Sequence, residues 1–199
     1  MSKLISRPKL DLSAFCDPYT RRYALATPFI QGEFVYATDG RILVQTTREL
    51  CEASEPTGKV PNGCATIVEP LDKVRDWDFP PPIVACEKCK GCGATFGICD
   101  VCNGLGYLVN GTNEFVPCGE CDGTTTWIER CEWCFAEYKN SIYGQWYMNH
   151  VRLLPNVRVG AISNSHEAPL YFRFDGGCGC LMPLQKSARA DAEAKRAHG

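Results

Sequence analysis

Residues 34–45 read FVYATDGRILVQ and carry the clearest structural signal in the sequence. Two runs rich in aromatic and β-branched residues flank Asp39-Gly40, a dipeptide that favours the tight turn of a β-hairpin. A similar pattern recurs near the other end of the chain, where PLYFRF (169–174) and CGCLMPL (178–184) flank Asp175-Gly176-Gly177. The two segments predict antiparallel strands joined by short turns.

Two further segments predict helices. Asp17-Pro18 combines an N-cap residue with a favourable first helical residue, which predicts a helix that runs through Leu25. A second helix is predicted over 142–154 and ends before Pro155, because apolar residues recur there at helical spacing: Ile142, Trp146, His150, Leu153 and Leu154. With further strands over 3–10 and 157–162, the order predicts an α+β fold with two helices on one face of an antiparallel sheet.

Four Cys-x-x-Cys pairs interrupt this pattern. Thiolate pairs at this spacing are typical of tetrahedral zinc sites, and eight ligands would supply two complete sets. A disulfide framework is the alternative. A zinc ion held by four thiolates has no coordination position left for water, so both ions would be structural. The pairs are Cys86/Cys89, Cys99/Cys102, Cys118/Cys121 and Cys131/Cys134.

The spacing leaves open how the pairs combine. Nine, fifteen and nine residues separate successive pairs, so either neighbouring pairs or the outer and inner pairs could each share a zinc ion. The proline run 80–82 marks the start of the inserted segment. We therefore expect a discontinuous body formed by 1–79 and 139–186, an inserted zinc-binding module over 80–138, and a polar tail over 187–199.

The glycines beside the cysteines suggest a known zinc module. CEKCKGCG (86–93) and CDVCNGLG (99–106) repeat a CxxCxGxG pattern that resembles the zinc-binding region of the DnaJ-type co-chaperones. In that family the first pair joins the fourth and the second joins the third. The resemblance implies one zinc ion on Cys86, Cys89, Cys131 and Cys134, and another on Cys99, Cys102, Cys118 and Cys121. The later pairs lack the full glycine pattern, and the His-Pro-Asp tripeptide of a J domain is absent from the sequence.

The body carries a second resemblance. YATDGR (36–41) resembles a recurring hairpin of the bacterial DNA polymerase III β sliding clamp, and LYFRFDGGCGCLMPL (170–184) resembles the C-terminus of that clamp, although LMPLQ (181–185) lacks its arginine. Such clamps string three domains in each chain and close a six-domain ring. The resemblance implies a single clamp-like domain here, so a ring would need six copies and the oligomeric state stays open. A clamp-like domain with a zinc insertion is what we would expect of a phage or mobile-element protein.

Charge separates the roles of the two parts. Residues 86–134 contain three basic and seven acidic side chains, and zinc-bound thiolates would add further negative charge. Nucleic-acid-binding modules carry clustered Lys and Arg instead, so we expect no contact between the zinc module and DNA. The rest of the chain holds 18 basic and 16 acidic residues. DNA contact would therefore depend on basic residues of the body, such as Lys3, Lys9, Arg21, Arg22 and Arg41.

Other candidate chemistry is sparse. The sequence contains no GxSxG, HExxH or Walker motif, and its three histidines (His150, His166 and His198) are dispersed. Cys178 and Cys180 would share one face of a strand, which allows a metal or redox role, although buried small apolar residues are the simpler interpretation. The same interpretation applies to Cys16, Cys51, Cys64 and Cys92, the last of which could also be a spare ligand. We therefore expect no enzymatic activity.

The location follows from the cysteines and the hydropathy. No apolar run is long enough to cross a membrane, and the N-terminus lacks the features of a signal peptide. Fourteen cysteines without an export signal indicate reduced thiols and a cytoplasmic protein, in the host cytoplasm if a phage encodes it. We expect a non-enzymatic, zinc-binding, sliding-clamp-like interaction protein that acts beside DNA replication or host machinery through a protein partner. A DnaJ-type zinc chaperone or thiol-redox module is the alternative.

Overall fold

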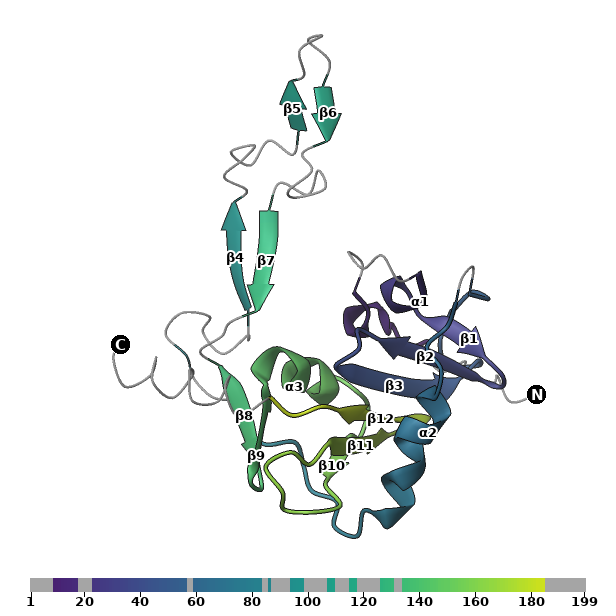
Figure 1. The fold of residues 1–199 in the computed structure, drawn as a ribbon, viewed down its shortest axis with the longest axis vertical. Coiled ribbons are helices and arrows are strands. Elements are labelled where there is room, and N and C mark those ends of the chain that lie inside the picture. The colour runs from purple at the N-terminus through teal and green to yellow at the C-terminus, as the bar shows by residue number, and fades with distance from the viewer. Residues whose placement is uncertain are drawn as a thin grey trace, which may run out of the picture.

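The computed structural model describes residues 9–17, 23–56, 59–83, 86, 94–98, 107–109, 115–117, 126–130 and 134–184. Its central element is a six-stranded antiparallel sheet in the order β1-β2-β3-β12-β11-β10 (Figure 1). The N-terminal half of the chain supplies three strands and the C-terminal half supplies the other three. These strands are β1 (Phe29–Gln31), β2 (Phe34–Thr38), β3 (Ile42–Thr47), β10 (Arg158–Gly160), β11 (Leu170–Phe174) and β12 (Gly177–Leu181).

Both predicted hairpins are confirmed. In the β2–β3 turn the Asp39 carboxylate oxygen Oδ1 accepts hydrogen bonds from the backbone N–H groups of Arg41 and Ile42 at 2.8 and 3.2 Å. Gly40 takes a φ of 89° there, which favours glycine. In the second hairpin Phe174 pairs with Gly177. The two halves of the sheet meet where β3 pairs with β12.

The alternating GCGC sequence of β12 has a packing explanation. Gly177 and Gly179 pair directly with Phe174 and Phe172 of β11, whose rings cover the bare glycine backbone. Cys178 and Cys180 project from the opposite face, as the alternation of strand residues requires. The prediction that these cysteines share a face is therefore confirmed.

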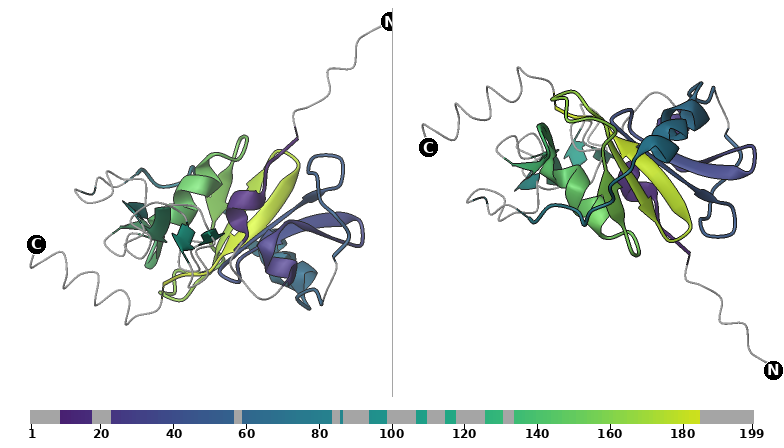
Figure 2. Two further views of the ribbon diagram at one scale, coloured as in Figure 1. Left: turned by 90° about the horizontal axis from the view of Figure 1, so that it is seen from above. Right: turned by 90° about the horizontal axis from the view of Figure 1, so that it is seen from below.

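The α+β class is confirmed, but helices cover both faces of the sheet rather than one. On one face lie η1 (Ser13–Phe15) and α3 (Gln145–Arg152) with the hairpin of β8 (Phe135–Tyr138) and β9 (Ser141–Gly144). On the other face lie α2 (Cys64–Val68) and η2 (Glu69–Lys73). Figure 2 shows the sheet between α2 and α3. The sequence did not predict α2, which is only five residues long.

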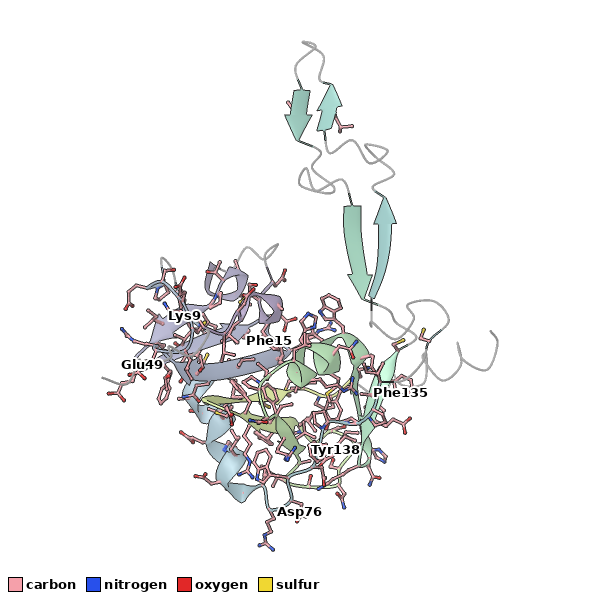
Figure 3. All side chains as sticks on the ribbon, turned by 180° about the vertical axis from the view of Figure 1, so that it is seen from behind. Lys9, Phe15, Glu49, Asp76, Phe135 and Tyr138 are labelled. Atoms are coloured by element: carbon pink, nitrogen blue, oxygen red, sulfur yellow. The ribbon has the colours of Figure 1, made fainter. Side chains whose placement is uncertain are left out.

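The predicted helix over 142–154 was wrong at its start and runs only to Arg152. Of its predicted apolar positions, Leu154 is buried in the main core, whereas Leu153 is exposed. Ile142 lies in β9, and α3 begins at Gln145. Its buried side chains include Tyr147, Met148 and Val151. The rings of Trp146 and His150 lie 4.4 Å apart between centroids and are tilted by 55° to each other. His150 in turn meets the ring of Phe15 edge-on, and Figure 3 shows Phe15 beside α3.

The first predicted helix is seen only in part. Helix α1 spans Tyr23–Ala26, whereas residues 18–22, over which the helix was predicted to start, lie outside the described residues. Most of the strand predicted over 3–10 and the tail 187–199 also lie outside them. Leu10 forms an isolated parallel bridge to Cys51.

The inserted segment contributes two strand pairs. β4 (Ala94–Ile98) pairs with β7 (Thr126–Arg130), and β5 (Tyr107–Val109) pairs with β6 (Phe115–Pro117). In Figure 1 the β4–β7 pair stands between the body and the β5–β6 pair. We call residues 86–134 the arm. β8 already belongs to the body, because Ala136 and Tyr138 are buried in its main core, so the body resumes at Phe135, slightly earlier than the sequence suggested.

Short segments flank both outer strands of the sheet. Ser54 forms a parallel bridge with Phe29 of β1, and Asp78 forms an antiparallel bridge with Val159 of β10. Each segment occupies part of an edge that could otherwise pair with another chain. Within the described ranges, no helix has the length and apolar character needed to cross a membrane.

Candidate functional site

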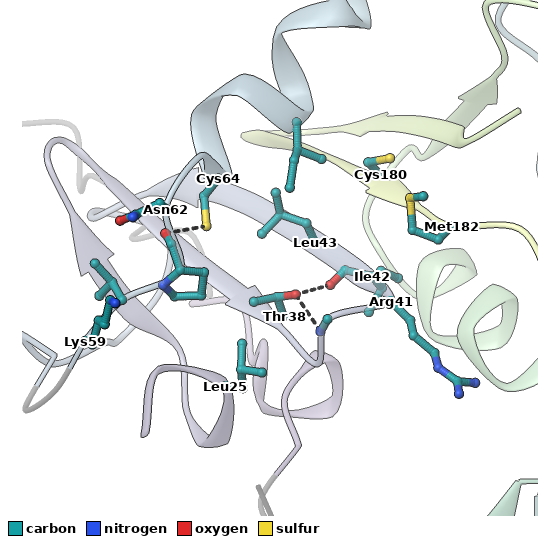
Figure 4. Close-up of a pocket in the computed structure, with 14 residues that line it drawn as sticks. Leu25, Thr38, Arg41, Ile42, Leu43, Lys59, Asn62, Cys64, Cys180 and Met182 are labelled. Atoms are coloured by element: carbon teal, nitrogen blue, oxygen red, sulfur yellow. Dashed lines mark hydrogen bonds between the residues drawn. The ribbon is translucent and has the colours of Figure 1, made fainter. Parts of the chain in front are cut away.

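The candidate site is a cavity of about 900 Å³ where the β2–β3 turn, α2 and the end of β12 meet. We call it the groove (Figure 4). Its lining comes from segments that are far apart in the sequence: Leu25, Thr38, Gly40, Arg41, Ile42, Leu43, Lys59, Val60, Pro61, Asn62, Cys64, Ile67, Cys180 and Met182. The groove therefore exists only once both halves of the sheet have come together.

The groove combines apolar walls with cationic ends. Ile67 and Met182 are 45% and 49% exposed, although both are large apolar side chains. The charged lining residues are Arg41 and Lys59, which Figure 4 shows at opposite ends of the group. The lining contains no carboxylate. An apolar ligand with negative charge would therefore match this surface.

A hydrogen-bond network holds the rim of the groove. The second carboxylate oxygen of Asp39, Oδ2, accepts a 2.5 Å hydrogen bond from the hydroxyl of Tyr147 on α3. The hydroxyl of Thr38 donates to the carbonyl of Ile42, and the backbone N–H of Met182 donates to the carbonyl of Arg41 at 2.9 Å. The rim is thus fixed to both α3 and the end of β12.

The cysteines on this face of the sheet are packing residues. Burial raises the pKa of Cys180 to about 12 and that of Cys178 to about 11, so both remain protonated at neutral pH. Burial also raises the pKa of Cys64, whose thiol lies 3.6 Å from the carbonyl oxygen of Pro61. A nucleophilic cysteine requires the thiolate instead. Cys16 and Cys51 are likewise buried.

The predicted zinc ligands fall mostly outside the described residues. Only Cys86, which is half-buried, and Cys134, which is buried, are described. The other six predicted ligands and Cys92 lie outside. In the part of the chain that the structure describes, no three potential metal ligands come together. The strand pairs nevertheless fix where the chain segments that carry the other cysteines begin and end.

The other residues singled out by the sequence are dispersed. Lys9 forms a 2.7 Å ion pair with Glu52, and Arg41 lies at the groove, while Lys3, Arg21, Arg22 and His198 lie outside the described residues. The ring nitrogens Nδ1 of His150 and His166 lie within hydrogen-bond distance of the carbonyl oxygens of Trp146 and Asn140. Among the described members, the sequence-predicted residues do not assemble a catalytic group. The sequence did not predict the groove, because only the Asp39-Gly40 turn at its rim has a local sequence pattern.

The described residues define an α+β protein in which both halves of the chain build one antiparallel sheet. Comparison with family models, curated proteins and solved structures finds no match for this chain. Its function is therefore inferred from the geometry of the groove and the arrangement of the arm.

Proposed function

We propose that this protein is a non-enzymatic interaction protein that binds a short segment of a partner protein in the groove. The observation that carries the proposal is the apolar cavity with exposed Ile67 and Met182. Ligand sites are concave and mostly apolar, with a few polar groups that fix orientation. The resemblance of YATDGR to the sliding clamp supports a partner from DNA replication or host machinery.

The occupant we propose is a peptide with two or more apolar side chains next to an Asp or Glu. Apolar side chains would cover Ile67 and Met182 and remove their surface from water. The acidic residue would lie near Arg41 or Lys59, because the lining offers positive charge and no carboxylate. The hydrogen bonds of Asp39 hold the rim in place, which lowers the entropic cost of binding.

We also propose that two structural zinc ions stabilise the arm. The two strand pairs of the arm support a pairing in which the first and fourth Cys-x-x-Cys pairs share one ion and the second and third share the other. Cys99 directly follows Ile98, whose partner is Thr126, and Cys118 directly follows Pro117, whose partner is Tyr107. The inner cysteine pairs therefore belong to the segments that link the two strand pairs, while the outer pairs flank the end of β4–β7 nearer the body. Cysteine thiolates in fours are the donor set that zinc prefers.

The groove can be tested with a library of random short peptides selected on the intact protein. We expect the selected sequences to combine apolar residues with Asp or Glu. Replacing Ile67 and Met182 together by Glu should weaken their binding at least tenfold, because the variant places negative charge in the groove. Both side chains are about half exposed, so the variant should still fold.

Leu153→Glu is the matched control. Leu153 is 82% exposed and lies at the end of α3, outside the groove lining. It tests whether a charge on an exposed apolar residue weakens binding nonspecifically. Equal binding of the selected peptides by wild type and the Ile67/Met182 variant would refute the groove as the binding site.

A further inference from the structure

Two arginines form a cationic pair at the edge of the sheet, away from the groove lining. Arg158 of β10 and Arg173 of β11 lie directly opposite each other in the strand register. Like charges at opposed positions normally destabilise a sheet. The described part of the chain forms two ion pairs, Lys9–Glu52 and Arg48–Glu55, and neither includes these arginines. Their positive charge is therefore available to a ligand.

Each guanidinium is supported by an aromatic ring. The Cζ atom of Arg158 lies 3.6 Å from the ring centroid of Phe79, and that of Arg173 lies 4.4 Å from the ring of Trp77. The rings belong to the segment that bridges to β10 through Asp78. Stacking orders a guanidinium without using its N–H donors, which stay free for phosphate oxygens.

Strand alternation separates these cations from the nearby carboxylate of Asp78. Asp78 lies between Trp77 and Phe79 in the sequence, and its carboxylate accepts a 2.6 Å hydrogen bond from Tyr138. Tyr138 belongs to the main core on the α3 face, whereas Trp77 packs on the opposite face with Tyr171. The arginines therefore present positive charge on one face, and Asp78 is used on the other.

We propose that Arg158 and Arg173 bind phosphates of a single-stranded nucleic acid, with Phe79 and its stacked guanidinium as a platform for a base. Phe79 is 72% exposed, so part of its ring is accessible to a base. Bases stack on aromatic rings and on guanidinium planes, and phosphates pair with arginine. The surface over β10 and β11 is open, so it suits an extended nucleic-acid chain better than a small anion, which would need an enclosed site.

The test is fluorescence anisotropy with the full protein and a labelled oligodeoxythymidylate of about 20 nucleotides. Arg158→Gln with Arg173→Gln should weaken binding roughly tenfold. It should also reduce the slope of log K against log salt by about 1.4, since each phosphate contact with a single strand contributes about 0.7. Arg48→Gln with Lys139→Gln removes the same charge from two exposed positions elsewhere and should change both quantities much less.

A second variant guards against loss of folding at the sheet edge. Phe79→Ala changes an exposed side chain and keeps both charges, and should weaken binding roughly fivefold or more through lost stacking, with little change in the salt slope. Excess inorganic phosphate distinguishes the source of the phosphate. We expect it to displace the strand only at the ionic strength at which chloride does so. No binding at low salt, equal loss in the two charge variants, or displacement by phosphate far below that ionic strength would overturn the proposal.

Discussion

Replacing the four inner cysteines of the arm by serine should remove one zinc ion and leave the other bound. If the outer pairs share one ion and the inner pairs share the other, this variant destroys only the inner site. If neighbouring pairs share ions instead, it removes two of the four ligands from each site and both ions are lost. The substituted residues are Cys99, Cys102, Cys118 and Cys121.

The expected pairing follows from the length of the β4–β7 ladder. Its register runs from Ala94–Arg130 at one end to Ile98–Thr126 at the other. Four steps of an extended strand cover about 14 Å, whereas thiolates on one zinc ion lie about 4 Å apart. Cys99 adjoins one end of the ladder and Cys131 adjoins the other. Neighbouring pairs could share an ion only if the linking residues folded back along the ladder.

Native mass spectrometry at near-physiological salt provides the assay, because it counts the zinc ions on each intact chain. A structural zinc site contributes roughly 10–16 kcal/mol of binding free energy at pH 7, so an intact four-cysteine set should stay occupied. A matched variant replaces Cys86, Cys89, Cys99 and Cys102 by serine. We expect it to bind no zinc. The opposite pattern, one ion on the matched variant and none on the inner variant, would refute the argument from ladder length.

Three further predictions concern the body. Gly179→Ala should lower the free energy of unfolding by roughly 1–3 kcal/mol, because the added methyl carbon would lie 2.2 Å from Phe172 Cζ and 2.3 Å from the Leu43 carbonyl oxygen. An unchanged urea midpoint would contradict this. Tyr147→Phe removes the hydroxyl that donates to Asp39 and should cost about 1–3 kcal/mol, measured by urea unfolding, with no change expected in zinc content. Burial raises the pKa of Cys180 from 9.0 to about 12, so the unfolded chain loses this thiol proton at a lower pH than the folded protein does. The free energy of unfolding should therefore fall as the pH rises between those values, by up to about 1.4 kcal/mol per pH unit. Cys180→Ala should reduce that fall, and identical pH profiles for variant and wild type would show that the thiol does not contribute.

The hairpins could be predicted from the sequence because their information is local. Asp39-Gly40 and Asp175-Gly176 specify their turns through side-chain hydrogen bonds or positive φ values. The helix over 142–154 was harder to place, because strand pairing to β8 takes Ile142 out of the helical pattern. The half-buried Trp146 and His150 follow the spacing of an apolar helix face. The core contacts of α3 come instead from neighbouring positions such as Tyr147 and Val151.

The candidate sites also differ in how far local sequence predicts them. Cysteine pairs indicate a metal through residue type and spacing, so the two zinc sites are a prediction from the sequence alone. The groove could not, since Leu25, Gly40, Ile67 and Met182 meet only after β3 pairs with β12. The cationic edge also depends on tertiary structure, because no spacing in the sequence relates Arg158 and Arg173 to Trp77 and Phe79.

The described contacts also show why the arm and the groove can be studied separately. The main core is built from residues within 10–53 and 136–181, and the rim of the groove depends on Tyr147, Asp39 and the end of β12. The chain passes from the arm to α3 through β8 and β9, where the Cys134 carbonyl accepts a 3.3 Å hydrogen bond from the Gln145 backbone N–H. Ala136 and Tyr138 are held there by the body core. The inner cysteines are remote in sequence from this junction. We therefore expect their replacement to change the zinc content without altering a residue that supports the groove.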